Sequence, residues 1–207
     1  MRGDAAPQDW RAWLTGCLDP LDLADPTVDF DHDPHALGMA HADFASAAVL
    51  VAVVEHVSGP TVILTRRSDT LRKHTGQVAF PGGRCDPGET PWVTALREAE
   101  EEIGLDPALV TVVGLSTPYR TGTGFHVTPV VGFVSPGFTL TPNPDEVAAV
   151  FETPWDYLMD LANHEEREGE FPTGTKRKYH AITWDEHLIW GATAGMVRAL
   201  RSRLYGT

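Results

Sequence analysis

Residues 83–105 read GRCDPGETPWVTALREAEEEIGL, a glycine turn and a short loop that lead into an acidic stretch. Thr90 followed by Pro91 is typical of a helix N-cap and the first helical residue. Gly104 is typical of the left-handed residue that ends a helix. We therefore predict a helix from about Pro91 to Ile103, preceded by a loop that holds one glutamate, Glu89.

Three glutamates of the predicted helix, Glu98, Glu101 and Glu102, share one face, because residues three and four apart are neighbours on a helix. Near a helix C-terminus they repel one another and oppose the helix dipole. A divalent cation removes both penalties, and Mg²⁺ and Mn²⁺ prefer carboxylate and phosphate oxygens. The alternative is a solvated acidic face. The glycine turn, Glu89, and Arg97, which can reach Glu101 or brace the loop, favour instead a metal site that takes phosphate.

The opposite side of the helix carries Val93, Leu96, Ala99 and Ile103. These apolar residues recur at helical spacing, which predicts a stripe that packs on the core. The acidic face is then expected to turn away from the core and toward the turn at Gly83.

The stretch matches the pattern G-x5-E-x7-R-E-U-x-E-E-x-G-U, where U is apolar, and so resembles the signature of the Nudix hydrolases. All seven fixed positions are present: Gly83, Glu89, Arg97, Glu98, Glu101, Glu102 and Gly104. Ala99 stands where a bulkier aliphatic residue is usual. The resemblance implies an α/β (α+β) fold, an α/β/α sandwich with a mixed central β-sheet flanked by helices. It also implies hydrolysis of a nucleoside diphosphate linked to another group.

The metal ligands are implied by the same resemblance. Glu98 and Glu102 would hold Mg²⁺ or Mn²⁺, with Glu101 close by and the carbonyl of Gly83 as a further ligand. The cation would neutralise the pyrophosphate and orient or acidify a water.

The implied catalytic roles fall on four residues, Glu98, Glu101, Arg97 and Glu89. Glu98 or Glu101 is the first choice for the base that takes the proton of the water. Arg97 and Glu89 would brace the loop and the helix. Some members of the family take the base from a distal loop, and the alternatives of that kind here are Glu146, Glu165 and Glu166.

Residues 63–83, ILTRRSDTLRKHTGQVAFPGG, resemble a further motif of the coenzyme A pyrophosphatase branch, L-L-T-x-R-S-x3-R-x3-G-x3-F-P-G-G, with one conservative departure at its first position. By composition this basic segment could be a solvated loop. The resemblance instead implies that Arg67 and Arg72 bind anionic parts of the nucleotide, including a 3′-phosphate. Phe80 and Gly82 would be further substrate contacts. The implied reaction hydrolyses coenzyme A to 4′-phosphopantetheine and adenosine 3′,5′-bisphosphate.

Two alternatives stay open. The first is a Nudix hydrolase of another nucleoside diphosphate derivative, such as ADP-ribose, NADH or capped RNA. The second is a Nudix-fold module that binds a nucleotide without cleaving it. Such modules usually lose one or more of the signature glutamates, and none is lost here.

The rest of the chain alternates apolar strand-like and helix-like segments, which is typical of a layered domain. We expect this single domain over residues 45–207, and over residues 1–44 an N-terminal helix and an irregular extension packed on it. Residues 163–175 are expected to be a mobile loop, and Pro129 to mark an edge strand or a bulge. Strands are predicted at 47–56, 61–66, 110–115, 125–134, 179–184 and 187–190, and further helices at 10–18, 154–161 and 193–205.

The composition limits the partners. A formal net charge of −13 argues against a nucleic-acid or anionic-membrane binder, although a bound cation can reverse the sign locally for a phosphate substrate. Cys17 and Cys85 lack CxxC spacing, which favours a reduced protein. Residues 1–7 lack the apolar stretch of a signal peptide, so none is expected, and no apolar run approaches the ~20 residues that a membrane span needs. We expect a cytoplasmic protein that acts on a small nucleotide, with a homodimer left open.

Overall fold

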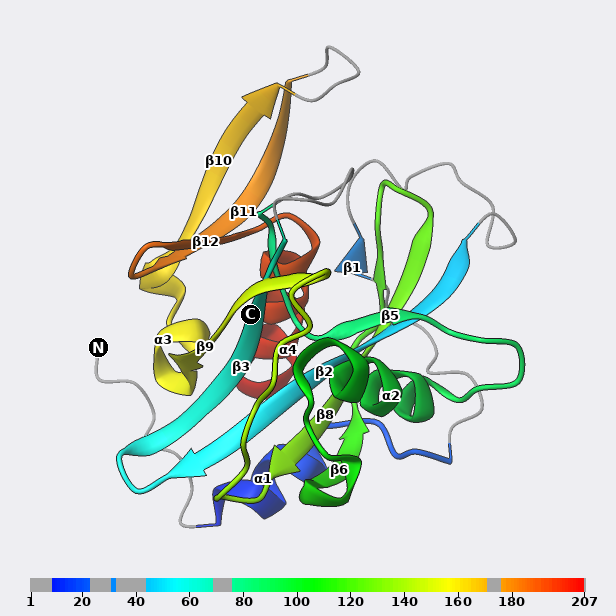
Figure 1. Cartoon of the computed structure of the whole chain (residues 1–207). Coiled ribbons are helices and arrows are strands. Elements are labelled where there is room, and N and C mark those ends of the chain that lie inside the picture. Colours follow the sequence, from blue (N-terminus) through cyan, green and yellow to red (C-terminus); the bar gives the residue numbers. More distant parts are fainter. Residues whose placement is uncertain (1–8, 23–30, 33–43, 69–75, 171–175, 207) are drawn as a thin grey trace.

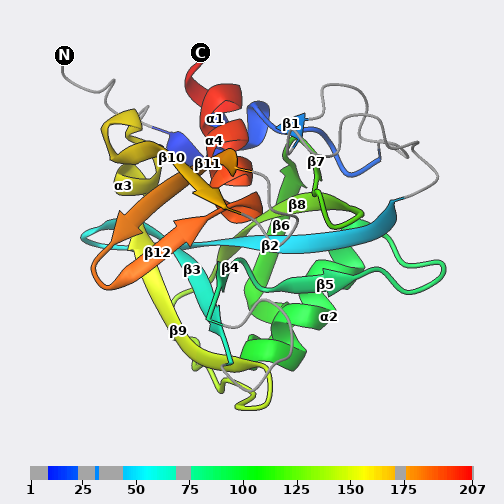
Figure 2. The same cartoon turned by 90° about the horizontal axis from the view of Figure 1, so that it is seen from above.

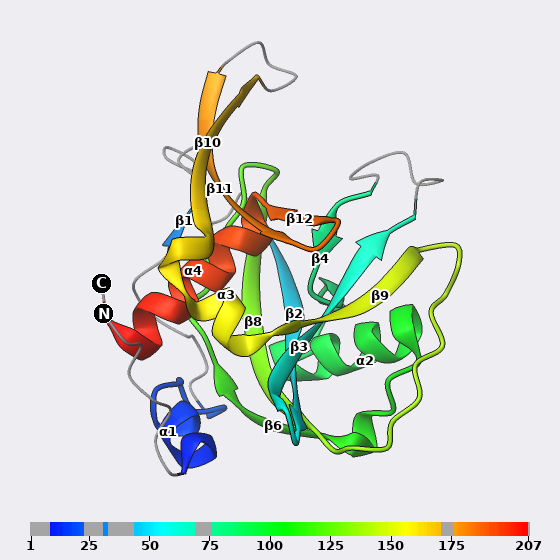
Figure 3. The ribbon, with the colours of Figure 1, turned by 90° about the vertical axis from the view of Figure 1, so that its left-hand side faces the viewer.

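The computed structural model of the chain describes residues 9–22, 31–32, 44–68, 76–170 and 176–206. Its main body has three layers, in which a large mixed β-sheet lies between two layers of helices (Figure 1). One face of the sheet is covered by helix α2 (Pro91–Ile103). The other face is covered by α1 (Trp10–Gly16), α3 (Trp155–Met159) and α4 (Ala192–Tyr205), as Figure 2 and Figure 3 show. The predicted α/β/α sandwich with a mixed sheet is confirmed.

Four long strands form the centre of the sheet, in the order β8 (Phe125–Val134), β2 (Ala45–His56), β3 (Gly59–Arg67) and β9 (Val147–Pro154). Strands β8 and β2 run parallel, and the other two pairs are antiparallel. The apolar run in β2 is almost continuously buried between residues 47 and 54. It is therefore covered on both faces of the sheet.

Alternate side chains of β2 point to opposite faces of the sheet and feed two separate cores. Leu50 and Ala52 pack in the cluster that includes Ala99 of α2. Val51 and Val53 pack in the cluster that includes α4. The two layers of helices are thus held by one strand.

Short strands extend this centre. Strand β5 (Gly82–Arg84) pairs with β2, and β4 (Val78–Ala79) pairs with β3. Strands β6 (Val110–Leu115) and β7 (Tyr119–Arg120) both pair with β8, and β1 (Asp31–His32) pairs with β7. Two short 3₁₀ turns, at Pro107–Leu109 and Leu161–Asn163, complete the connections.

The prediction that Pro129 marks an edge or a bulge is wrong, because β8 has neighbours on both sides. The bulge lies in the partner strand β6, between Val112 and Gly114. The carbonyl of Pro129 accepts a hydrogen bond from the N–H of Ser116 (2.9 Å), beyond the end of β6 and before β7 begins. The N–H and C=O of one strand residue point to the same side, so the missing N–H of Pro129 falls in the gap between the two partner strands.

Helix α2 has the predicted bounds and ends at Gly104, which has a left-handed φ of +67°. Its rotation differs from the prediction. Val93, expected in the core, is 46% exposed. Glu102, expected to face away from the core, is buried beside Ala99 and Ile103. The helix therefore turns one of its glutamates inward.

The N-terminal segment 9–22 packs against the α4 face. Leu14 of α1 is fully buried. The guanidinium of Arg203 forms a bidentate pair with Asp19 (Nη1 to Oδ2, 2.9 Å), and Asp19 and Leu115 exchange backbone hydrogen bonds of 2.9 and 2.8 Å. These contacts join the segment to both the last helix and the sheet.

The prediction of a loop over residues 163–175 is wrong for residues 164–170, which form strand β10 (His164–Glu170). This strand pairs with β11 (Lys176–Trp184), which pairs in turn with β12 (His187–Trp190). The β10–β11 ribbon projects from the body, away from α2 (Figure 1, Figure 3). Its charged residues are held across the strands, as by Lys178 Nζ and Glu166 Oε1 at 2.6 Å.

The hairpin predicted from residues 179–190 is present as β11 and β12. Cys17 and Cys85 both carry free thiols, as expected for a reduced protein. In the described ranges, each helix is too short or too polar to cross a membrane.

Candidate active site

Two glycines bring β5 close to α2. A Cβ atom on Gly83 would lie 2.5 Å from each carboxylate oxygen of Glu98. A Cβ on Gly82 would lie 2.6 Å from the Cα of Val49 on the neighbouring strand. Any larger residue would push the strand and the helix apart. The glycine pair therefore lets the backbone of β5 approach the acidic face of α2.

Arg97 ties the loop to the helix. Its guanidinium binds both oxygens of Glu89, with Nε to Oε1 at 2.9 Å and Nη2 to Oε2 at 3.0 Å. Nη1 donates to Glu98 at 2.9 Å and to Glu101 at 3.2 Å, and Nη2 reaches the carbonyl of Arg84. Both contacts predicted for Arg97, the reach to Glu101 and the brace to the loop, are present.

Glu89 closes the loop before α2. Its carboxylate accepts hydrogen bonds from the hydroxyl of Thr94 (2.7 Å) and the N–H of Asp86 (3.0 Å), in addition to the pair with Arg97. The Arg97 hydrogen bonds, followed by these two, lower the pKa of Glu89 to about 2. Thr90 occupies the N-cap position as predicted, but its side chain makes no capping hydrogen bond.

Glu102 is the most deeply buried carboxylate of the site, with 3% of its surface exposed. Its Oε2 accepts a hydrogen bond from the N–H of Gly82 (3.1 Å), and its Oε1 lies 3.5 Å from Nη1 of Arg67. Burial raises the pKa of Glu102 to about 7, against the opposing effects of Gly82 and Arg67. Burial also raises the pKa of Glu98. Two neighbouring carboxylates of one helix are thus held where their charge is disfavoured.

A third carboxylate comes from a distant part of the chain. The charge of Glu146 is close enough to raise the pKa of both Glu98 and Glu102. The loop that carries it is held by the backbone, since Asn143 N–H donates to the carbonyl of Glu102 (2.8 Å). Ser68 N–H donates to the carbonyl of Glu146 (2.8 Å). The structure therefore brings Glu146 to the acidic face of α2.

Glu165 and Glu166, the other predicted distal carboxylates, lie on the β10–β11 ribbon. They bind Arg167 (2.7 Å) and Lys178 (2.6 Å) respectively. The ribbon points away from α2, so the structure does not bring these two residues to the other carboxylates.

The acidic face supplies the kind of donors that a divalent cation needs. Carboxylate oxygens of Glu98, Glu101 and Glu102 and the backbone carbonyl of Gly83 are hard ligands suited to Mg²⁺ or Mn²⁺. Across the described ranges, no three acidic, histidine or cysteine side chains already stand as a closed ligand group. Glu98 and Glu101 are instead turned to Arg97. The donor set fits the cation in kind, and its carboxylates would exchange arginine partners for the ion.

Only some of the four predicted substrate-binding residues lie at the site in the part of the chain that the structure describes. Arg67 lies beside Glu102, whereas Arg72 is outside the described residues. Phe80 is 3% exposed and packs in the core on the α4 side, so its side chain supports the turn and does not line the site. The N–H of Gly82 is engaged by Glu102.

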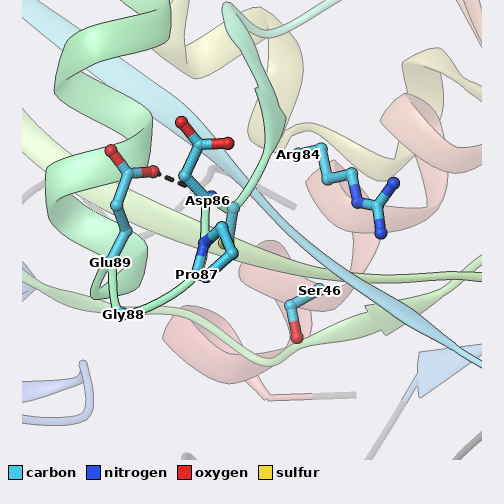
Figure 4. A pocket seen from close by; sticks show the side chains of 7 residues that line it. Ser46, Arg84, Asp86, Pro87, Gly88 and Glu89 are labelled. Carbon is cyan, nitrogen blue, oxygen red and sulfur yellow. Dashed lines mark hydrogen bonds between the residues drawn. The ribbon is translucent and has the colours of Figure 1, made fainter.

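A cavity of about 590 Å³ adjoins the loop between β5 and α2. Figure 4 shows Arg84 on one side of it, Asp86 and Glu89 on the other, and Ser46 of β2 near Arg84. Sequence reasoning missed Arg84 and Ser46.

Comparisons with known proteins agree on one family. Residues 45–173 match the family model described as the NUDIX domain. A protein named "Uncharacterized Nudix hydrolase NudL" from Photorhabdus laumondii is 41% identical over 159 residues, which is 76% of this chain and 84% of that protein. A protein of the same name from Yersinia pestis is 39% identical and covers 76% and 79% of the two chains.

Two of the similar solved structures each cover about half of the chain. The crystal structure of a Nudix hydrolase from M. smegmatis, RenU, has 25% identity and a TM-score of 0.46, over 54% of this chain and 71% of that one. A C. elegans Ap4A hydrolase binary complex has 19% identity and a TM-score of 0.47, over 53% and 80%.

Proposed function

The chain belongs to the Nudix hydrolases, and we propose that its substrate is coenzyme A, hydrolysed at the pyrophosphate bond. The family match supports the hydrolase, and the upstream basic motif supports the choice of substrate. The observation that carries the proposal is the contact of Arg67, from that motif, with Glu102, from the signature helix, at 3.5 Å. The basic motif and the signature helix therefore lie side by side, as expected if both act on one substrate.

Glu98 and Glu102 are the proposed ligands of Mg²⁺ or Mn²⁺, with Glu101 and the carbonyl of Gly83 completing the set. A divalent cation bound there supplies charge neutralisation of the pyrophosphate and a more acidic water. Glu98 and Glu102 are well suited to this role, because burial makes their negative charges unfavourable until a cation compensates them.

Arg97 and Glu89 are proposed to position the ligands. Nη1 of Arg97 donates hydrogen bonds to both Glu98 and Glu101, and the carboxylate of Glu89 anchors Arg97 by accepting two more, from Nε and Nη2. Neither residue needs to touch the substrate for its loss to reduce the rate, because small displacements of catalytic groups are costly.

The general base takes one proton from the attacking water as its oxygen bonds to phosphorus. Glu98, Glu101 and Glu146 remain the proposed candidates. Glu101 is more than half exposed and bound by Arg97, whereas Glu146 approaches the buried pair from the opposite loop. We favour Glu146, because it is the carboxylate whose charge reaches both Glu98 and Glu102 from outside the helix.

The reaction balances without a further reactant. Water adds to one phosphorus of coenzyme A, the bridging P–O bond breaks, and the bridging oxygen leaves with the other phosphate. The products are 4′-phosphopantetheine and adenosine 3′,5′-bisphosphate. Arg67 is proposed to contact the anionic part of the substrate, and the cavity beside Arg84 offers space and a second cation for the remainder.

The test is a side-by-side assay of coenzyme A, dephospho-coenzyme A, ADP-ribose, NADH and diadenosine polyphosphates, with Mg²⁺ and with Mn²⁺. The proposal predicts the highest kcat/KM for coenzyme A, and a lower value for the dephospho form that lacks the 3′-phosphate. Faster turnover of ADP-ribose or NADH would assign the protein to another Nudix substrate. Tight binding without turnover of any of them would indicate a nucleotide-binding module.

A further inference from the structure

Arg67 belongs to the basic motif of residues 63–83 and lies beside Glu102 of the signature helix. It is the last residue of β3, and the register of β3 against β9 shifts between Arg66 and Arg67. Its N–H donates to the carbonyl of Gln77 (2.9 Å), and the next residue, Ser68, donates to the carbonyl of Glu146 (2.8 Å). The backbone of Arg67 is therefore held from both sides, and its side chain is the part that can move.

The side chain of Arg67 is directed at the carboxylate of Glu102. Nη1 lies 3.5 Å from Oε1, which is an ion-pair distance beyond hydrogen-bond length. The Arg67 side chain is 30% exposed, while that of Glu102 is 4% exposed. Within the described ranges, Nε of Arg67 is buried and has no hydrogen-bond partner. Arg67 is thus close to Glu102 but only loosely attached to it.

The two oxygens of Glu102 have different partners. Oε2 is held by the N–H of Gly82, a neutral backbone donor. Oε1 faces Arg67, which lowers the pKa of a carboxyl that burial raises. Glu98, the other proposed ligand on this helix, is paired with Arg97 instead. Each buried glutamate thus has its own arginine, and only Arg97 is bound by hydrogen bonds on several sides.

We propose that Arg67 is a displaceable counterion of Glu102, which a divalent cation replaces and thereby frees for the anionic group of the substrate. The inference rests on the metal site of the proposed function and deepens it. In the metal-free protein Arg67 offsets the buried charge of Glu102. Cation and guanidinium cannot both approach Oε1 closely, because like charges repel. When the cation arrives, Arg67 turns to a phosphate, which it can bind in a bidentate manner.

Cooperativity follows from this exchange. If the metal frees Arg67, it raises the affinity for an anion, and by linkage the anion raises the affinity for the metal by the same factor. Removing the charge of Arg67 should have two effects. The metal should bind more tightly on its own, because its competitor is gone. The coupling between metal and anion should disappear.

The experiment titrates Mn²⁺ into the full-length protein by calorimetry and by the electron paramagnetic resonance signal of free Mn²⁺, and repeats this with AMP present. The variants are Arg67→Gln, Arg67→Met as a second neutral form that keeps the aliphatic stem, and Arg67→Lys, which keeps the charge. Arg167→Gln is the matched control, since it removes one positive charge from the β10–β11 ribbon, which projects away from α2. Thermal unfolding of each variant checks that it is folded.

The expected result for Arg67→Gln and Arg67→Met is Mn²⁺ binding tighter by about fivefold, the factor that corresponds to about 1 kcal/mol. Arg67→Lys and Arg167→Gln should stay within about twofold of the unchanged protein. Mn²⁺ should strengthen AMP binding to the unchanged protein, and this effect should vanish in both neutral Arg67 variants. Equal or weaker Mn²⁺ binding by these variants, or the same change in Arg167→Gln, would overturn the proposal.

The outcome is separable from that of the proposed function. The Mn²⁺ titration needs no turnover, so a protein that fails to cleave coenzyme A can still show the Arg67 effect. Conversely, coenzyme A hydrolysis with unchanged Mn²⁺ binding in Arg67→Gln would keep the function and reject the counterion.

Discussion

Replacing Glu102 by glutamine should stabilise the metal-free protein at high pH and leave it almost unchanged in acid. Glu102 has 4% of its side chain exposed, and burial raises its pKa from 4.5 to about 7. A carboxyl with a raised folded-state pKa prefers its proton in the folded protein. Its contribution to stability is therefore lost as pH rises from 4.5 through about 7, where the folded protein must give up that proton. Glutamine has no proton to lose and avoids this penalty.

The size of the effect follows from the same pKa. Linkage gives about 1.4 kcal/mol per pH unit between the unfolded and folded pKa values, which is about 3 kcal/mol above pH 7. At pH 5 the penalty falls below about 1 kcal/mol. For a chain of this size, about 3 kcal/mol corresponds to a rise in Tm of roughly 6–12 °C. Glutamine can still accept the hydrogen bond from Gly82, and its neutral amide loses the attraction to Arg67, which the raised pKa already includes.

The assay is urea and thermal unfolding in excess EDTA at pH 5 and pH 8, for the unchanged protein and for Glu102→Gln. Glu100→Gln is the control, because Glu100 is exposed on the same helix, and it should change stability by less than about 0.5 kcal/mol. Adding Mn²⁺ at pH 8 should stabilise the unchanged protein and have little effect on Glu102→Gln. If the two proteins lose stability in parallel between pH 5 and pH 8, the reasoning about the buried carboxylate is refuted.

Three further predictions concern the surrounding residues. Gly83→Ala places a Cβ against the Glu98 carboxylate, so kcat should fall by about 10²-fold. Gly16→Ala, which has open space around it, is the control and should not change kcat. Normal turnover in Gly83→Ala would contradict the close approach of β5 to α2. Glu89→Gln should lower the Tm at pH 7. The difference in Tm from the unchanged protein should shrink as pH falls from 4.5 toward 2, because a carboxylate with a lowered folded-state pKa stabilises the protein only while it is ionised. A difference that stays constant down to pH 2 argues against the Arg97 pair as its cause. Glu146→Gln should lower kcat by about 10²- to 10⁴-fold with KM nearly unchanged. Glu166→Gln, on the β10–β11 ribbon, should leave kcat unchanged. A larger loss of kcat in Glu166→Gln would instead assign the general base to the ribbon.

Local signals in the sequence predicted the signature helix well. Pro91 and Gly104 set its ends through backbone preferences that depend on few neighbours. Its rotation could not be predicted, because the inward turn of Glu102 depends on the close approach of β5, which two glycines permit. For this reason the predicted apolar stripe includes Val93, which is exposed, and leaves out Ala95, which is buried.

The β10–β11 ribbon shows a different limit. Residues 164–170 read HEEREGE and have no apolar alternation, so nothing local indicates a strand. Their pairing with residues 176–182 and the Lys178–Glu166 ion pair hold the ribbon together. Such cross-strand contacts appear only once the partner strand is known.

The candidate site was predictable in its residue types but not in its electrostatics. The signature spacing named Glu89, Arg97 and Glu98, and the structure joins them by hydrogen bonds. The approach of Glu146 to Glu98 and Glu102 and the pairing of Arg67 with Glu102 link residues that are 35 to 48 positions apart in the chain. Contacts of that kind follow from the order of strands in the sheet, which local patterns do not determine.

Product analysis is the sharpest test of a metal-dependent hydrolysis of coenzyme A at its pyrophosphate bond. Coenzyme A is incubated with Mn²⁺ and the protein, and the products are separated by chromatography and identified by mass. We expect 4′-phosphopantetheine and adenosine 3′,5′-bisphosphate in equal amounts, neither product in EDTA, and almost none with Glu98→Gln. Intact coenzyme A after prolonged incubation, or release of inorganic phosphate with the pyrophosphate bond left whole, would contradict it.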